Sequence, residues 1–163
     1  MATANKNLSQ YDPRELPDAS DLSIALVVAE WNGEITQGMH DGAMEVLKDC
    51  GAMPTRIKRF DVPGAMEITH ACKMLCEADN YDAIIAIGCV VKGETAHFEY
   101  VCQSVTHGIT ELNLRYKTPV IYSILTDNNI EQSRARAGGK HGNKGVEAAV
   151  AALKMAGLHR LLS

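Results

Sequence analysis

The segment Gly93-Glu94-Thr95-Ala96-His97 brings a glycine turn, a hydroxyl group and an imidazole close together. It separates a run typical of a buried strand from a run with helical spacing. A glycine turn that leads into a helix leaves backbone N–H groups free, and the positive end of the helix dipole favours an anion such as phosphate there. Thr95 either caps the helix or donates its hydroxyl to that anion.

His97 is the candidate for proton transfer beside this anion site. An imidazole titrates near neutrality, so it can both accept and donate a proton. The helix N-terminus disfavours the imidazolium form, whereas a bound phosphate favours it. A solvated surface histidine is an equally good explanation of the same position.

Two other segments carry unusual side chains just after runs typical of strands. Trp31, the only tryptophan, stands with Asn32 after the first run, and Ala65-Met66-Glu67 follows the Pro63-Gly64 turn after the second. Trp31 either stacks on a flat ligand or covers the rim of the core. Glu67 either contacts a ligand or, as is more common for an acid in a first helical turn, interacts with the helix dipole.

The stretch from Arg134 to Lys144 is basic and is interrupted by glycines. It is not a nucleotide-binding P-loop, because GxxxxGK[ST] is absent and a helix rather than a strand is expected before it. The stretch is either a flexible surface loop or a source of cations for phosphate. An arginine suits the second role because its planar guanidinium binds two oxygens at once.

The elements that must position these residues alternate between strands and helices. Short apolar runs rich in β-branched side chains predict strands, and apolar residues at helical spacing predict helices. The expected strands are 22–30, 56–62, 83–91 and 119–125, and the expected helices are 36–50, 66–79, 97–115, a short one from 129 and a last one from 144. This alternation predicts an α/β fold with a central four-stranded parallel sheet that is covered on both faces.

Such a sheet also predicts where a ligand binds. Ligands lie beyond the carboxyl ends of the strands, near the point where the strand order reverses. The expected chemistry therefore lies in residues 31–35, 63–67, 92–97 and 126–128.

Length and charge narrow the class of protein. The 163 residues suit one α/β domain over residues 21–163, preceded by residues 1–20 as a tail or one added strand. A net charge of −4 without a basic stripe argues against a nucleic-acid partner. No apolar run reaches membrane-spanning length and the N-terminus lacks the apolar core of a signal peptide, so we expect a cytoplasmic protein with no membrane partner.

The five cysteines favour buried thiols over a metal site. They are Cys50, Cys72, Cys76, Cys89 and Cys102. Cys72 and Cys76 share one face of an expected helix, but no second pair of ligands has suitable spacing. Free cysteine is commonly a small buried hydrophobe, so no metal is predicted.

Several motifs together resemble lumazine synthase. The resemblance runs from residue 22 to residue 158 with nearly no gaps, and GETAHFEYV at residues 93–101 is its most specific part. The other matching motifs are Val62–Ile68, Tyr81–Gly88, Pro119–Ile121 with Leu125–Thr126, Ile130–Gln132, Arg136–Gly138 and Gly142–Gly145. Residues 1–20 lie outside the resemblance.

The resemblance implies a fold and a reaction. The fold would be the flavodoxin-like three-layer αβα sandwich. The enzyme would be a transferase of riboflavin biosynthesis that condenses 5-amino-6-(D-ribitylamino)uracil with 3,4-dihydroxy-2-butanone 4-phosphate. The product would be 6,7-dimethyl-8-ribityllumazine, with phosphate and water released and with no cofactor or metal taking part.

The resemblance also implies an assembly. Members of the family work as homopentamers whose active sites are shared between subunits. Some members close twelve pentamers into an icosahedral shell of sixty subunits. Riboflavin synthase is a further candidate partner.

Site roles are implied residue by residue. His97 matches the proposed proton-transfer residue, and Glu67 would hold ribityl hydroxyls. The phosphate of the second substrate would be bound by Glu94 through its backbone N–H, by Thr95 and by Arg136. Contacts to the pyrimidine substrate are implied for Trp31, Asn32, Ala65, Met66, Glu67, Cys89, Val90, Val91, Tyr122 and Lys144.

Some matched positions differ from the usual family residue, and some belong to the adjacent subunit. Trp31 and Tyr122 stand where phenylalanine is usual, Met66 stands where an aromatic residue is common, and Lys92 stands where arginine is usual. The resemblance implies that Tyr122, Arg136 and Lys144 come from the neighbouring subunit.

Three other functions are compatible with the same fold. A catalytically idle relative could bind flavin or lumazine, although His97 and Arg136 are intact. A shell could serve mainly to enclose other proteins. A flavodoxin-like electron carrier is disfavoured, because no loop rich in serine and threonine follows the first strand to bind an FMN phosphate.

Overall fold

A parallel sheet forms the middle layer of the structure, a computed structural model that describes residues 9–162. Its strands lie in the order β2-β1-β3-β4. Their bounds are Ile24–Ala29 for β1, Ile57–Val62 for β2, Ala83–Val91 for β3 and Val120–Asp127 for β4. The direction in which the sheet grows reverses between β1 and β3, and the crevice for a ligand is expected at that point.

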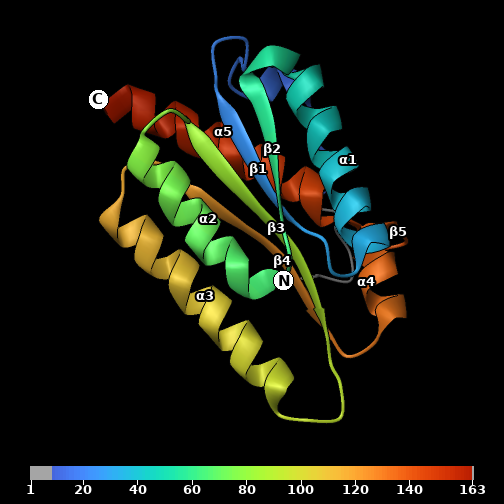
Figure 1. The fold of residues 1–163 in the computed structure, drawn as a ribbon. Helices are drawn as coiled ribbons and strands as arrows, with labels where there is room; N and C mark the ends of the chain where they lie inside the picture. The colour runs from blue at the N-terminus through green and yellow to red at the C-terminus, as the bar shows by residue number, and fades with distance from the viewer. Residues whose placement is uncertain (1–8, 163) are drawn as a thin grey trace.

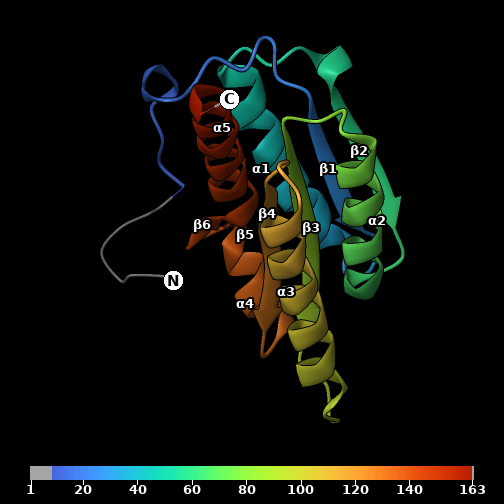
Figure 2. The ribbon, with the colours of Figure 1, turned by 90° about the vertical axis from the view of Figure 1, so that its left-hand side faces the viewer.

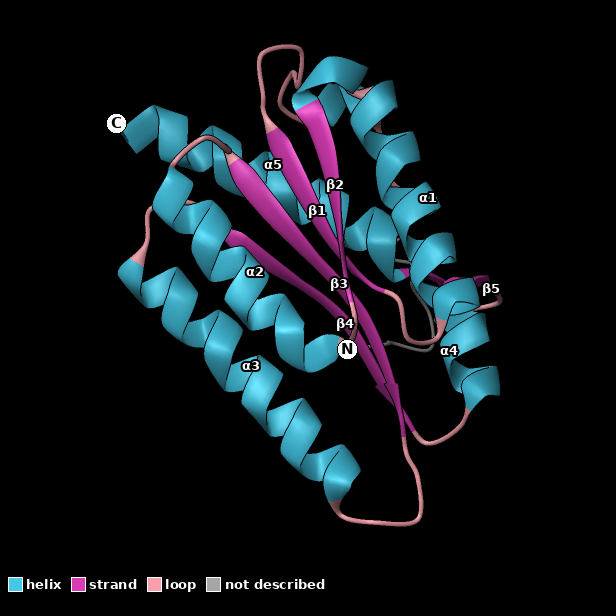
Figure 3. Cartoon of the chain, in the orientation of Figure 1, coloured by secondary structure: helices cyan, strands magenta, loops and turns pink. Residues whose placement is uncertain are grey.

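Helices cover both faces of this sheet (Figures 1 and 3). Helices α1 (Gly33–Asp49) and α5 (Lys144–Leu162) pack on one face, and α2 (Ala65–Ala78) and α3 (His97–Arg115) pack on the other. The short α4 (Ile130–Arg136) leads into a hairpin of β5 (Ala137–Gly139) and β6 (Gly142–Asn143), and 3-10 turns lie at Pro13–Glu15 and Pro54–Arg56. The predicted three-layer αβα sandwich is confirmed.

Strand β1 shows why the strands could be recognised from sequence. Every one of its six residues is buried, because successive side chains point to opposite faces that are both covered. Ile24, Leu26 and Val28 join the core beneath α1 and α5, while Ala25 and Val27 join the core beneath α2 and α3. A strand buried on both faces needs a continuous apolar run, which is the pattern seen.

Several observed boundaries differ from the expected ones by one to three residues, and the structure explains the two largest shifts toward longer elements. Helix α1 begins at Gly33 rather than at residue 36, because Asn32 adopts a left-handed conformation (φ 58°) and its carbonyl accepts the N–H groups of Ile35 and Thr36. Strand β4 continues to Asp127 because Thr126 and Asp127 pair with the end of β3. The hairpin of β5 and β6 is not predicted by any apolar pattern.

The segment before β1 packs along the end of α1 (Figure 2). Of residues 1–20, expected as a tail or an added strand, residues 1–8 lie outside the described residues and 9–20 form no strand. The Tyr11 hydroxyl donates to Asp49 at 2.7 Å, and the Ala19 N–H donates to the Cys50 carbonyl at 2.8 Å. These contacts hold the segment to the domain.

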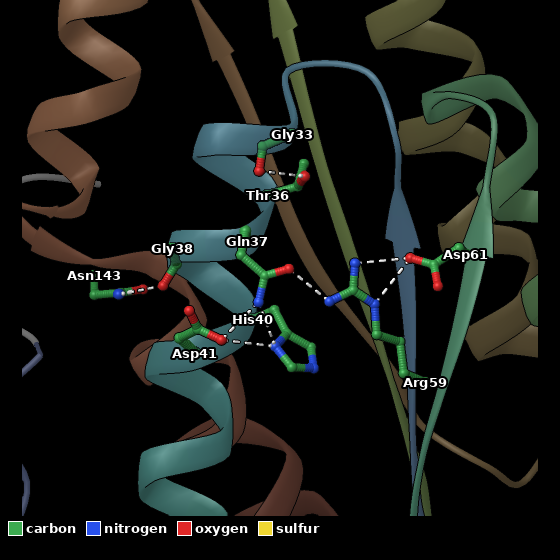
Figure 4. A network of polar contacts seen from close by, with 9 residues as sticks. All are labelled: Gly33, Thr36, Gln37, Gly38, His40, Asp41, Arg59, Asp61 and Asn143. Carbon is green, nitrogen blue, oxygen red and sulfur yellow. Dashed lines mark hydrogen bonds and ion pairs between the residues drawn. The ribbon is translucent and has the colours of Figure 1, made fainter.

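A polar network braces the edge strand β2 against α1 (Figure 4). Arg59 donates to Asp61 at 2.8 Å and to the Gln37 side-chain oxygen at 2.7 Å. Gln37 in turn donates to Asp41 at 2.7 Å, and the His40 ring lies 3.0 Å from the same carboxylate. The hydrogen bond from His40 holds the pKa of Asp41 below its usual value. Charged side chains of this kind protect an edge strand from pairing with other chains.

Three glycines allow α1 to lie close to the β5–β6 hairpin and to the start of α5. The Asn143 side chain donates to the Gly38 carbonyl at 2.9 Å and accepts the Gly145 N–H at 2.8 Å. A Cβ on Gly42 would lie 2.4 Å from the Asn143 side chain, and a Cβ on Gly145 would lie 1.7 Å from the Met39 carbonyl oxygen. The amide of Asn143 therefore fixes the hairpin and the start of α5 against α1.

Thiols fill gaps in both cores. Cys50, Cys72, Cys76 and Cys89 are buried and Cys102 is partly buried, which confirms the buried-thiol prediction for the first four. Burial raises the pKa of Cys76 to about 11. Within residues 9–162, no helix is long and apolar enough to cross a membrane, and no group of three or more acidic, histidine or cysteine side chains could hold a metal ion.

We predict that Gly145→Ala destabilises the fold strongly. The added methyl group meets backbone atoms of Met39, which cannot move without displacing α1. Overpacking of this kind costs about 3 kcal/mol, so the thermal midpoint of the purified protein should fall by about 10 °C. Gly33→Ala is the matched control, because a Cβ there has no atom within 4 Å. Equal midpoints for the two variants would contradict the close packing of α1 and α5.

Candidate active site

The crevice between β1 and β3 is bridged by a side chain. Asn32, the N-cap residue of α1, donates its side-chain N–H to the Cys89 carbonyl at 2.9 Å. Cys89 lies near the end of β3 with its side chain buried, while Val90 and Val91 are partly exposed. The bond links the loop after β1 to the end of β3, which is the predicted location of a ligand.

Trp31, Gly64 and Glu67 meet beside this crevice. The backbone N–H of Trp31 donates to the Pro63 carbonyl at 3.2 Å, and this bond joins the loop after β1 to the loop after β2. A Cβ on Gly64 would lie 3.2 Å from the indole Cδ1 and 3.3 Å from a Glu67 carboxylate oxygen. The side chain of Trp31 does not fill the core, since the residue is 72% exposed. An exposed indole beside a carboxylate can stack on a flat polar ring and bind its hydroxyl substituents.

The first turn of α2 continues the same surface. Ala65 is buried, whereas Met66 is 47% exposed and Glu67 is exposed. The N-cap residue Gly64 has no side chain that could cap the helix. The structure thus brings Trp31 and Glu67 together at Gly64, whereas Met66 helps to line a hollow between α2 and α3.

The turn between β3 and α3 lies at the far tip of this edge, beyond the first turn of α2 (Figure 1). The His97 N–H donates to the Thr95 hydroxyl at 3.4 Å, and Ala96 at the N-cap position offers no side-chain cap. Glu94, Thr95 and His97 are all exposed. Apart from this bond to Thr95 no side chain within residues 9–162 caps the helix start, and an exposed helix start with an adjacent hydroxyl and imidazole suits an anion.

The root of this turn is held in place. The Lys92 N–H donates to the Asp127 carbonyl at 2.9 Å, which extends the pairing of β3 and β4 by one bond. The Lys92 ammonium lies 3.4 Å from Glu99 on α3. The turn is therefore fixed at both ends.

Arg136 lies on the other face of the sheet from His97. Helix α3 belongs to the face covered by α2, whereas α4 adjoins α1 (Figure 1). The Arg136 guanidinium lies 3.6 Å from the carboxylate of Asp127, at the end of β4. Asp127, Arg136, Lys140 and His141 help to line a hollow of about 540 Å³. Within one chain, the Arg136 guanidinium and the His97 imidazole thus belong to opposite faces of the sheet.

The two remaining predicted residues have contacts of their own. The Tyr122 hydroxyl lies 3.3 Å from the Thr106 hydroxyl of α3, and burial raises the pKa of Tyr122. Lys144, in the first turn of α5, forms a close ion pair with Glu147 one turn further on. Tyr122 thus lies on the α3 side of the sheet and Lys144 on the α5 side.

Sequence reasoning missed two residues of this region. Asp127 is almost buried, and it accepts a 2.8 Å hydrogen bond from the fully buried Ser133. The sequence predicts chemistry in the segment 126–128 but does not identify Asp127 as the residue that carries it. An acid at the end of a buried strand is the signal that could have identified Asp127, whereas no signal in the sequence identifies Ser133.

Comparison with known proteins relates the sequence to one family of enzymes. A sequence model of the 6,7-dimethyl-8-ribityllumazine synthase family matches residues 21–160. The chain is 52% identical over 156 residues to the 6,7-dimethyl-8-ribityllumazine synthase of Flavobacterium johnsoniae, an alignment that covers 96% of this chain and 82% of that protein. It is also 52% identical over 161 residues to the proteins of that name from Christiangramia forsetii (98% and 96% covered) and Porphyromonas gingivalis (99% and 100% covered).

We predict that Gly64→Ala displaces the Trp31 ring. The added methyl group meets the indole and the Glu67 carboxylate, both of which are exposed and can move, so the fold should lose about 1 kcal/mol or less. Because Trp31 is the only tryptophan, its fluorescence emission should shift in the variant. Gly93→Ala, where a Cβ meets nothing within 4 Å, should leave the emission unchanged. An unshifted fluorescence emission in Gly64→Ala would mean that the indole of Trp31 does not pack against Gly64.

Proposed function

We propose that the active site combines a surface formed by Trp31, Gly64 and Glu67 of one subunit with Arg136 of the next. The chain belongs to the 6,7-dimethyl-8-ribityllumazine synthase family. As a member of that family it is a transferase of riboflavin biosynthesis. It condenses 5-amino-6-(D-ribitylamino)uracil with 3,4-dihydroxy-2-butanone 4-phosphate to 6,7-dimethyl-8-ribityllumazine, with release of phosphate and water.

The meeting of Trp31, Gly64 and Glu67 is the observation that carries the assignment of the pyrimidine site. The exposed indole offers a flat apolar face to the pyrimidine ring, and the Glu67 carboxylate beside it accepts hydrogen bonds from ribityl hydroxyls. Asn32 keeps the end of β3 next to this face, so that backbone groups of residues 89–91 can contact the ring edge. In this proposal Ala65 and Met66 form the remaining wall.

The phosphate of the second substrate is assigned to the turn before α3. The backbone N–H of Glu94 and the Thr95 hydroxyl would bind this phosphate at the start of α3. Glu94 would contribute only through its backbone, because its carboxylate would repel the phosphate. Arg136 of the neighbouring subunit would supply the positive charge. Helix α3, which carries His97, and helix α4, which carries Arg136, cover opposite faces of the sheet, and this separation within one chain supports the shared arrangement.

The chemistry follows from holding two substrates together. The pyrimidine amine attacks the ketone, and a first water leaves as a Schiff base forms. Phosphate is then eliminated and the neighbouring hydroxyl carbon becomes a carbonyl. The ribitylamino nitrogen attacks this carbonyl, and a second water leaves as the ring closes. Well-oriented reactants reach effective molarities of about 10⁵ M or more, so binding side by side supplies most of the rate gain. His97, exposed beside the phosphate turn, would relay protons in these steps and contribute about 10²–10⁴-fold. Arg136 and the start of α3 would stabilise the departing phosphate.

A homopentamer is the proposed assembly. A ring of five subunits would place Tyr122, Arg136 and Lys144 of each chain at the site of its neighbour. The placement of His97 and Arg136 on elements that cover opposite faces of the sheet supports this arrangement, because one chain alone does not bring the two groups together. A shell of sixty subunits and an association with riboflavin synthase are extensions of the same proposal.

The cytoplasm is the proposed location. All five cysteines are free, and Cys50, Cys72, Cys76 and Cys89 are buried as thiols. Free thiols persist in reducing compartments.

We expect His97→Ala to slow turnover and to leave the fold and assembly unchanged. The side chain is exposed, so its loss removes a proton relay without opening a cavity. Lumazine formation, followed by its fluorescence, should fall about 10²-fold or more. His107→Ala, further along the same helix, is the control. Unchanged turnover in His97→Ala would remove this residue from the mechanism.

A mixing experiment tests whether sites are shared. His97→Ala and Arg136→Gln subunits are each assayed alone, and then unfolded and refolded together in equal amounts. If one chain supplies His97 and the next supplies Arg136, a random ring contains about one quarter of sites with both residues intact. Activity should therefore recover to about a quarter of the wild-type level at subsaturating phosphate substrate. Recovery no greater than the average of the two single variants would contradict a shared site.

A further inference from the structure

A chain of buried polar groups leads from Cys89, whose carbonyl accepts the hydrogen bond from Asn32, to Arg136. The Cys89 thiol donates to the Ser133 hydroxyl at 3.4 Å, and Ser133 donates its own proton to the Asp127 carboxylate at 2.8 Å. Ser133 is fully buried and the Asp127 side chain is 6% exposed. The Ser133 hydroxyl has a single proton and donates it to Asp127, so Ser133 can only accept in its contact with the Cys89 thiol.

The Asp127 carboxylate needs a cation. A buried carboxylate is stable only if it is paired and hydrogen-bonded. Ser133 satisfies one carboxylate oxygen, and the Arg136 guanidinium lies 3.6 Å from the other. The Arg136 side chain is 28% exposed, so part of the guanidinium stays open to a ligand.

Helix α4 itself is held rigidly. Asn129 accepts the Gln132 N–H at 3.0 Å, and the Gln132 side chain accepts the Asn128 N–H at 2.9 Å, which closes the start of the helix. Arg134 makes two hydrogen bonds, of 3.0 and 2.9 Å, to the carboxylate of Glu34 on α1. The backbone beneath Arg136 is therefore fixed, and the main freedom left is that of its long side chain.

We propose that Asp127, oriented by Ser133, is a positioning residue that holds one edge of the Arg136 guanidinium so that the other edge faces the phosphate of the substrate. This inference rests on the proposed function, which assigns Arg136 to that phosphate. A guanidinium has five N–H donors in one plane, so an ion pair at one edge leaves a two-donor edge for the ligand. Orientation before binding removes an entropy cost that would otherwise weaken affinity.

Asp127→Asn tests the proposal without changing the size of the side chain. The variant should raise the KM for 3,4-dihydroxy-2-butanone 4-phosphate about five- to twentyfold and leave the KM for the pyrimidine within about twofold. The inhibition constant of inorganic phosphate should rise by the same factor as the first KM. Ser133→Ala, which keeps the carboxylate but loosens it, should raise the same KM about two- to fivefold.

Asp12→Asn is the matched control, because Asp12 pairs with Arg14 at 2.7 Å on the exposed N-terminal segment. It removes the same charge from an Asp–Arg pair and should change neither KM. The Asp127→Asn/Arg136→Gln double variant completes the set. If Asp127 acts through Arg136, the double variant should have the phosphate-substrate KM of Arg136→Gln alone.

Each outcome separates the two proposals. If Arg136→Gln leaves the phosphate-substrate KM unchanged, the assignment of Arg136 in the proposed function is wrong. If Arg136→Gln raises that KM but neither Asp127→Asn nor Ser133→Ala does, the positioning role is wrong and the proposed function stands. Multiplicative effects of Asp127→Asn and Arg136→Gln, or equal rises in both KM values, would also overturn the positioning role. Ser133→Ala provides the answer if Asp127→Asn does not fold.

Discussion

Burial of the parallel sheet on both faces is the constraint on which the rest of the structure depends. The two central strands, β1 and β3, carry almost no polar side chain along their length because helices cover each face, whereas the edge strand β2 carries charged residues. Polar side chains with chemical roles are therefore confined to the strand ends and the helix starts that follow them. Trp31, Glu67 and His97 all occupy such positions, and the hydrogen bond from Asn32 to the end of β3 spans the reversal in strand order. The location of the site is thus a consequence of the core.

Much of this arrangement could be predicted from sequence because the main signals are local. The bounds of β3 match the expected 83–91, since a strand buried on both faces has a continuous apolar run. The proximity of the Trp31 loop to the Gly64 turn also followed, because β1 and β2 are neighbours and their ends meet at one edge. The start of α1 and the β5–β6 hairpin did not follow. The first depends on the left-handed backbone of Asn32, and the second on an Asn143 amide that contacts a different helix.

The charged residues show where sequence reasoning stops. Arg134 and Arg136 lie two positions apart in similar surroundings, yet Arg134 pairs with Glu34 on α1 and Arg136 pairs with Asp127 on β4. Helix orientation, rather than residue type, decides which arginine faces which acid. Ser133 was equally invisible, because a hydroxyl shows its importance only when its partners Cys89 and Asp127 are known to be buried around it. Long-range electrostatics of this kind require the folded structure.

Asp127 also takes part in a second contact through its backbone. Its carbonyl accepts the Lys92 N–H at the root of the turn that is assigned to phosphate, while its carboxylate holds Arg136. In the proposed ring, that turn serves the site of its own subunit and Arg136 serves the site of the next. In that arrangement Asp127 would link two neighbouring sites, by a backbone hydrogen bond to the turn of one and by an ion pair to the arginine of the other.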